Sequence, residues 1–353
     1  MDKSLSKKIS FLNFVFTIGI VIYHSKNFHQ LFSNTDTIYT DLLYELYDVI
    51  GALSMGFFFT ISGYLFYRGL DTVKKIGPKI KKRLLTLGIP FIVWNVLYLL
   101  YNLLYALISQ KNELLSYSFL DVLLGFSFVP FNRPFWYIFA LICIMLLSPI
   151  ILVLKKSPRI FLIFLCTLTV GSYISAVCVV SDNQVIIWVV RLLNYLPTYL
   201  FGAYIALCGD SVMVSEKLQR KSVCIISGLI SVLILIYLLL FSTGMVAIDW
   251  VLHRVLPISV WLSFRNKMFE RTNISFALSI SFFIYAMHSI LIGILNTIIS
   301  KIVGYNSLHP ILTIPAYILF IACLYGICLF VAFLGKKLLP KKLYFALSGG
   351  RVN

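Results

Sequence analysis

Charged residues are scarce in this chain of 353 residues: they make up 12% of the sequence, and only 13 residues are Asp or Glu. Hydrophobic residues make up 60%, a share that no water-soluble domain of this length shows. The composition therefore excludes a water-soluble protein and indicates a polytopic membrane protein. No separate soluble domain, low-complexity tract or repeat divides the chain, so we expect a single integral membrane domain over residues 1–353.

Paired cysteines are also lacking. The seven cysteines form an odd set without a C-x-x-C pair, and all fall in or at the ends of apolar stretches, which is typical of small buried hydrophobic residues. No His, Cys or carboxylate pair has the spacing of metal ligands, so we expect neither disulfides nor a metal site. A cleavable signal peptide is not apparent either, and the first apolar stretch is expected to remain as an anchor.

Long apolar stretches are abundant. A helix needs about 20 apolar residues to cross the hydrocarbon core of a bilayer. We expect spans near residues 10–28, 49–67, 84–109, 135–154, 160–180, 185–208, 222–242, 249–264, 274–299 and 311–334. The predicted fold is an all-α, polytopic membrane bundle of about ten transmembrane helices.

Basic residues gather in every second loop of this layout and at both chain ends. The exceptions are Lys26, Lys111, Arg133, Arg191, Arg254 and Lys301. Because cytoplasmic loops hold the Lys and Arg excess, both termini are predicted to be cytoplasmic. The basic loops that give the net charge of +17 then determine the topology and bind anionic membrane lipid. Nucleic acid is not an expected partner.

Four separate predicted spans carry basic or imidazole groups in their interior, namely His24, Arg191, Arg254 beside His253, and His288. At 1.5 Å per residue, both arginines and His24 lie roughly 8–10 Å below the outer surface. An arginine facing lipid at the centre of a bilayer costs about 2.5 kcal/mol or more, which favours a shared polar cavity. The alternative is that each arginine extends upward to the lipid headgroups. Two other histidines, His29 and His309, are expected in loops.

Several motifs follow one another in a specific order. They are FFFTISGYL at residues 57–65, the basic turn KRLL at 82–85 with Pro90, Phe91 and Trp94 after it, PFWY at 134–137, YLFGA at 199–203 and SFFIYAMH at 281–288. Together with His24 at the end of the first span, this series resembles the membrane-bound acyltransferase family 3. The resemblance covers about residues 10–334, and the ten-helix layout is that of the family.

The resemblance implies an O-acyltransferase in the inner (plasma) membrane, with acetyl-coenzyme A as the usual donor and an envelope glycan or lipid-linked sugar as acceptor. A sugar hydroxyl is a poor nucleophile, so it needs a general base, and His24 has the right type and depth. The oxyanion on the thioester carbonyl needs donors or cations, a role for Arg191 or Arg254. His288 is either a structural polar residue or a second base.

Binding residues are expected on both sides of the membrane. Lys79, Lys82 and Arg83 form a cytoplasmic cluster suited to the phosphates of coenzyme A, although setting topology alone would also explain them. The residues expected to contact the acceptor are Arg133, Trp136, Tyr137 and Ser62. For these the alternatives are an interfacial aromatic belt for the two rings and close helix packing at Ser62.

Two positions depart from the family pattern. The family commonly has an arginine eleven residues before the histidine, where this chain has Asn13, and a second basic residue in the cytoplasmic turn, where it has Thr86. Both changes remove charge from the expected donor side. The second hypothesis for function is a transporter or flippase that exports a polysaccharide or lipid-linked sugar, which inverted repeats and paired interrupted helices would favour; neither is clear in the sequence.

Overall fold

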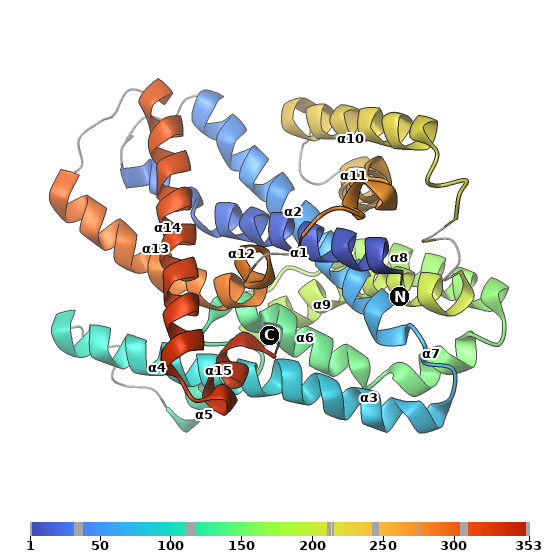
Figure 1. The fold of residues 1–353 in the computed structure, drawn as a ribbon, viewed down its shortest axis with the longest axis horizontal. Coiled ribbons are helices and arrows are strands. Elements are labelled where there is room, and N and C mark those ends of the chain that lie inside the picture. Colours follow the sequence, from blue (N-terminus) through green and yellow to red (C-terminus); the bar gives the residue numbers. More distant parts are fainter. Residues whose placement is uncertain are drawn as a thin grey trace.

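A computed structural model describes residues 2–31, 38–109, 118–209, 213, 215–241, 247–273, 276–303 and 310–350. The regular structure in these ranges is entirely helical (Figure 1). The long helices are α1 Lys3–His24, α2 Ile38–Tyr67, α4 Ile89–Ser109, α8 Pro158–Cys178, α9 Gln184–Cys208, α10 Lys221–Phe241, α11 Ala247–Ser263, α13 Ser281–Val303 and α14 Pro310–Leu338. The short ones are η1 Lys26–Leu31, η2 Val73–Lys75, α3 Ile76–Arg83, η3 Leu84–Gly88, α5 Phe119–Gly125, η5 Arg133–Phe135, α6 Trp136–Met145, α7 Ser148–Leu154, η7 Asn266–Phe269, α12 Phe276–Ser279 and α15 Lys341–Ser348.

Each expected span contains a helix, and the predicted all-α polytopic bundle is confirmed. Within the described ranges, eight helical segments are long and apolar enough to cross a membrane, and α6 with α7 makes a ninth if the pair is one span bent by 60°. The bend falls just before Pro149, which lacks the N–H that would continue the helix. The remaining expected span corresponds to α11, whose 17 residues are fewer than the usual 20.

The helices α1, α2 and α9 pack at the centre of the molecule (Figure 1). At the crossing of α2 and α9, a Cβ atom on Gly63 would lie 2.0 Å from the carbonyl oxygen of Tyr199, and one on Gly202 would lie 1.9 Å from that of Thr60. Only glycine permits this approach of two backbones. The small residue of the FFFTISGYL motif therefore serves close helix packing.

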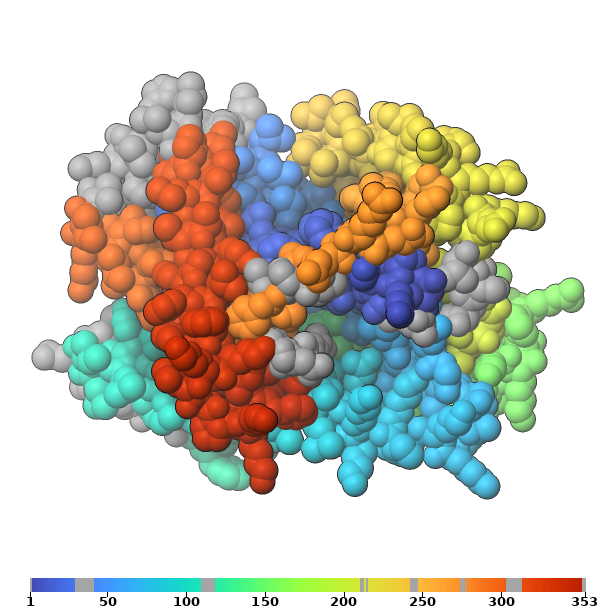
Figure 2. All heavy atoms as spheres, viewed as in Figure 1, coloured from blue at the N-terminus to red at the C-terminus, as the bar shows by residue number. Residues whose placement is uncertain are grey.

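The other helices lie around this centre. The α10 and α11 helices pack together on one side, while α13 and α14 pack together on another. The C-terminal α14 and α15, red in Figure 2, lie over the surface beside α13 and α4. The indole N–H of Trp94 on α4 donates a hydrogen bond of 3.0 Å to the carbonyl of Leu347 on α15, which ties the chain's last helix to the bundle.

Candidate active site

A cavity of about 940 Å³ lies beside the end of α1, near the upper size of typical ligand pockets. Its walls come from α1, η1, α2, α9, α11 and the segment that leads into α6. Its ionisable lining residues are His24, Lys26, Glu45, Asp48, Arg133, Arg191 and His253, and its aromatic ones are Tyr23, Phe128, Trp136, Trp188 and Tyr195. We call this the outer cavity, because the predicted topology places it at the external side.

His24 is the last helical residue of α1, and hydrogen bonds from α14 fix that helix end. The hydroxyls of Ser25 and Tyr317 are 2.7 Å apart, and the Tyr317 hydroxyl donates to the carbonyl of Ile22 at 2.9 Å. Both bonds tie the end of α1 to α14. The imidazole of His24 is therefore presented to the outer cavity from a fixed backbone position.

His288 on α13 faces His24, with the two ring centroids 5.2 Å apart. The side chain of His288 is fully buried, and its Nδ1 lies 2.7 Å from the carbonyl oxygen of Tyr285. Because a carbonyl only accepts, Nδ1 carries the hydrogen and Nε2 holds a lone pair. Nε2 is buried without a hydrogen-bond partner among the described residues. A neutral acceptor thus lies beside the His24 ring.

The two intramembrane arginines differ in placement. The guanidinium of Arg191 lies 5.0 Å from the ring centroid of Trp136, and Arg191 lines the outer cavity together with His24. Arg254 instead stacks on the Trp250 ring and donates to the carbonyl of Trp250 at 2.8 Å and to that of Asn194 at 3.0 Å. Arg254 lines a smaller side pocket of about 210 Å³. Its hydrogen bonds to Asn194 and Trp250 link α9 to α11.

The segment that leads into α6 is fixed by buried amides. The backbone N–H of Asn132 donates to Asn95 Oδ1 at 3.1 Å, and Asn132 Nδ2 donates to the carbonyl of Ala286 at 3.0 Å. The Tyr285 hydroxyl donates to the carbonyl of Pro134. Arg133, between these anchored residues, therefore has a fixed backbone. Earlier in the same segment, hydrogen bonds from the hydroxyl and N–H of Ser118 lower the pKa of Asp121.

A second pocket, of about 300 Å³, lies at the predicted cytoplasmic side. Its polar lining residues are Ser6, Ser10, Asn13, Thr17, Ser62, Arg83, Tyr137, Tyr199, Ser281 and Tyr285. The hydroxyls of Ser62 and Tyr137 are 2.8 Å apart, and the Tyr199 hydroxyl is buried with no hydrogen-bond partner among the described residues. We call this the inner pocket. Met55 lines both the inner pocket and the outer cavity.

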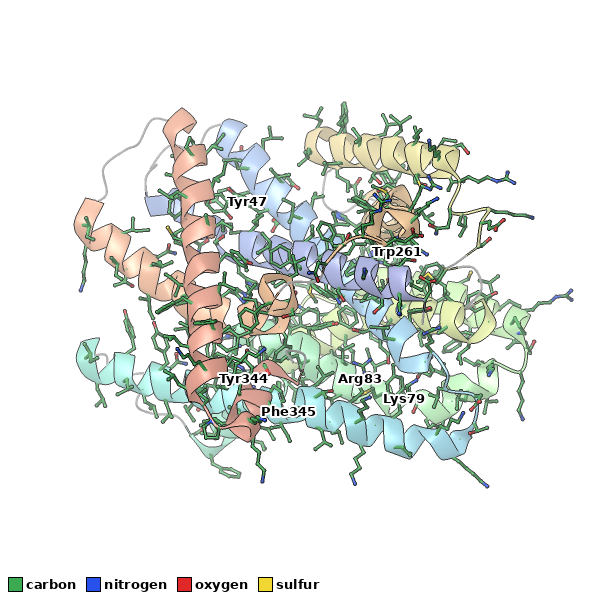
Figure 3. The ribbon with its side chains drawn as sticks, viewed as in Figure 1. Tyr47, Lys79, Arg83, Trp261, Tyr344 and Phe345 are labelled. Atoms are coloured by element: carbon green, nitrogen blue, oxygen red, sulfur yellow. The ribbon has the colours of Figure 1, made fainter. Side chains whose placement is uncertain are left out.

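The three residues of the basic cytoplasmic cluster have different surroundings. Arg83 lines it, whereas Lys82 is exposed; Lys79 donates to the carbonyl of Arg68 at the end of α2. Figure 3 shows Lys79 and Arg83 on the α3 side of the bundle. A π-helical turn, η3, follows Arg83 directly, and such turns are frequent at functional sites. Within it the Thr86 hydroxyl donates to the carbonyl of Lys82 at 3.0 Å.

Seven of the residues singled out in the sequence fall into two sites, whereas Arg254, His288, Lys79 and Lys82 line neither. The outer cavity brings together His24, Arg191, Arg133 and Trp136, while the inner pocket holds Arg83, Ser62 and Tyr137. The sequence did not point to Met55, because a methionine in an apolar span has no distinguishing pattern. Tyr199 and Tyr285 fell within motifs, but the sequence assigned neither a role. His309 and the side chain of His29 lie outside the described residues.

Comparison with known proteins gives one finding. A family model described as an acyltransferase domain matches residues 7–334, nearly the whole chain. No curated protein and no solved structure matches.

Proposed function

Because this chain belongs to membrane acyltransferase family 3, and is therefore a multi-pass membrane acyltransferase, we propose that it transfers an acetyl group from acetyl-coenzyme A to a hydroxyl of an envelope glycan or lipid-linked sugar. The observation that carries this proposal is the position of His24 in the wall of the outer cavity, with the inner pocket on the other side of Met55. Two substrates can thus approach from opposite sides.

His24 is the general base of this reaction. Its imidazole takes the proton of the acceptor hydroxyl while that oxygen attacks the thioester carbonyl. The new carbon–oxygen bond replaces the carbon–sulfur bond, and the proton passes from His24 to the departing thiolate of coenzyme A. An ester and a free thiol are the products, so the imidazole returns to its neutral form.

His288 is a positioning residue in this scheme. Its ring lies 5.2 Å from the His24 ring, measured between centroids, and Tyr285 keeps Nδ1 as the donor. An N–H of His24 directed to His288 leaves the other His24 nitrogen free to accept a proton. A hydrogen-bond partner that selects the tautomer of a base is a recurring arrangement in acid–base catalysis.

The inner pocket takes the acyl-pantetheine end of the donor. Its volume of about 300 Å³ suits a narrow arm rather than the whole of coenzyme A, whose phosphates remain near the exposed basic residues of α3. Arg83 and the unpartnered Tyr199 hydroxyl offer hydrogen bonds to the carbonyl groups of the arm. Asn13, where the family commonly has arginine, lines the same pocket, so this chain binds the donor there with one positive charge fewer.

Acetyl transfer by membranes that carry His24→Ala tests the proposal. We expect the rate of label transfer from acetyl-coenzyme A to envelope polysaccharide to fall about 10²- to 10⁴-fold, the usual contribution of a general base. His29→Ala, which changes a histidine of η1 five residues further along the chain, is the matched control at equal expression.

Unchanged transfer by the His24 variant would remove this residue from the mechanism. If neither wild type nor variant incorporates acetyl or another short acyl group while polysaccharide export depends on the chain, the transporter hypothesis replaces the enzymatic one.

A further inference from the structure

We infer that the acceptor sugar carries an anionic group, a carboxylate or a phosphate, and that Arg133 and Arg191 bind it beside the Trp136 ring. This inference rests on the proposed function, because it concerns the substrate of the same site. It assigns Arg191 to the acceptor rather than to the oxyanion of the thioester.

Both guanidinium groups belong to one wall of the outer cavity. The Arg191 guanidinium lies 5.0 Å from the centroid of Trp136. Arg133 precedes Trp136 by three residues in the helical turn that runs from η5 into α6, and residues with this spacing share a helix face. All three residues line the cavity that His24 faces. Arg133 and Arg191 thus line the same cavity as the Trp136 ring and the proposed base.

No carboxylate of the described residues neutralises this pair. Two acidic side chains line the outer cavity, and one of them, Asp48, forms an ion pair of 3.2 Å with Lys26. The other is Glu45, and no ion pair joins either acidic side chain to Arg133 or Arg191 among the described residues. Neighbouring like charges repel each other, and an anion between them removes that repulsion.

The backbone around Arg133 is already fixed before a ligand binds. Asn95, Asn132 and the carbonyl of Ala286 hold the backbone before Arg133, and Tyr285 holds the carbonyl of Pro134 after it. A backbone fixed on both sides loses little conformational freedom when a ligand binds. A guanidinium offers a planar fork of donors that matches carboxylate and phosphate oxygens, and a neutral glycan offers no charge to these two groups.

The shared chemistry is an oxyanion on a sugar, which has two sources: the carboxylate of a uronic acid, or the phosphate that joins a sugar to a lipid or to the next unit. The Trp136 face accommodates the apolar face of a sugar ring next to either group. Binding there would place the hydroxyls of that sugar in the cavity with His24.

Ligand-induced thermal stabilisation of the purified full chain in lipid nanodiscs tests the inference. The probes are trigalacturonate, glucose 1-phosphate and the neutral maltotriose, each titrated at low salt. The variants are Arg133→Gln and Arg191→Gln, with Arg191→Lys as the conservative change. Arg159→Gln, which removes the same charge from the start of α8 at the predicted cytoplasmic side, is the matched control. Size-exclusion profiles and the unliganded melting temperature verify folding.

We expect at least one anionic probe to bind at least 10-fold more tightly than maltotriose. Each Gln variant should weaken that binding about 10- to 100-fold, as the loss of a charged hydrogen bond does, and Arg191→Lys should weaken it less. Preference for trigalacturonate identifies the carboxylate source, and preference for glucose 1-phosphate identifies the phosphate source. Equal affinity for all three probes, or equal loss in Arg159→Gln, would overturn the inference.

Acetyl transfer is measured on the same nanodiscs with labelled acetyl-coenzyme A and envelope polysaccharide. If acetyl transfer persists but no anionic probe binds more tightly than maltotriose, the inference is wrong and the proposed function stands. Anionic preference without transfer of any acyl group supports the subsite but removes the enzymatic role of the outer cavity.

Discussion

At the scale of single residues, two imidazoles lie side by side but have different surroundings. His24 borders the outer cavity, while His288 is enclosed by protein and bonded to a backbone carbonyl. The His288 ring has no access to a substrate hydroxyl, so it acts through His24.

His288→Leu is therefore expected to lower kcat for acetyl transfer about 10- to 100-fold, as the loss of a residue that orients a catalytic group does, with little change in KM for acetyl-coenzyme A. His288→Gln places an amide oxygen near the position of Nε2 and should restore part of kcat. Steady-state kinetics of both variants measures kcat and KM for acetyl-coenzyme A. A rise in KM with unchanged kcat, or a Gln variant no better than Leu, would exclude a positioning role.

Sequence reasoning identified both histidines but not their relation. A titratable ring in an apolar span is visible in the sequence, whereas the carbonyl that fixes His288 comes from the turn before it and the facing ring comes from a helix more than 250 residues away. The same limit applies to Arg254, whose bonds to Asn194 and Trp250 depend on how α9 and α11 cross.

At the scale of elements, the crossing of α2 and α9 sets the position of the residues around the inner pocket. Ser62, beside Gly63, and Tyr199, three residues before Gly202, both line that pocket. From the sequence, close packing was an alternative expected at Ser62 in the first of these motifs. The second motif carried no such prediction, and neither indicated which helices meet. The bend between α6 and α7 was also missed as a bend, since residues 135–154 were expected to form one straight span despite Pro149.

Gly63→Ala and Gly202→Ala should each lower the melting temperature of the protein in detergent. An added Cβ would overlap a backbone oxygen, which cannot rotate away, and overpacking costs about 1–3 kcal/mol or more. Gly171→Ala on α8 is the control, because a Cβ there meets no atom within 4 Å. Melting curves of all three variants decide the question: equal midpoints for Gly63→Ala and Gly171→Ala would show that the two helices do not meet so closely.

At the scale of the whole molecule, the arrangement predicts that the two cavities open to opposite sides of the membrane. Basic loops in the sequence gave the expected orientation, and the cavities were found on the two ends of α1: Ser6 lines the inner pocket and His24 the outer cavity. Cavities could not be foreseen from spans alone, because their shape depends on how far neighbouring helices diverge.

Cysteines introduced at Ser6 and Gln184 test this sidedness with a maleimide that does not cross membranes. Gln184 lines the outer cavity, so Gln184→Cys should react in right-side-out vesicles and Ser6→Cys in inverted ones, each at least several-fold above the unsubstituted chain. That chain is a necessary control because it has seven cysteines of its own. Reaction of both variants from the same side would contradict the predicted topology.

The shared side chain of Met55 has an electrical consequence. Where two polar cavities enter a bilayer from opposite sides, the insulating layer between them is thinner than the hydrocarbon core, and the transmembrane voltage falls mainly across that layer. A unit charge that crosses a full drop of 100 mV changes its energy by about 2.3 kcal/mol. With the predicted topology, the field is steepest at the Met55 partition, and the proposed acetyl transfer carries an uncharged group through it.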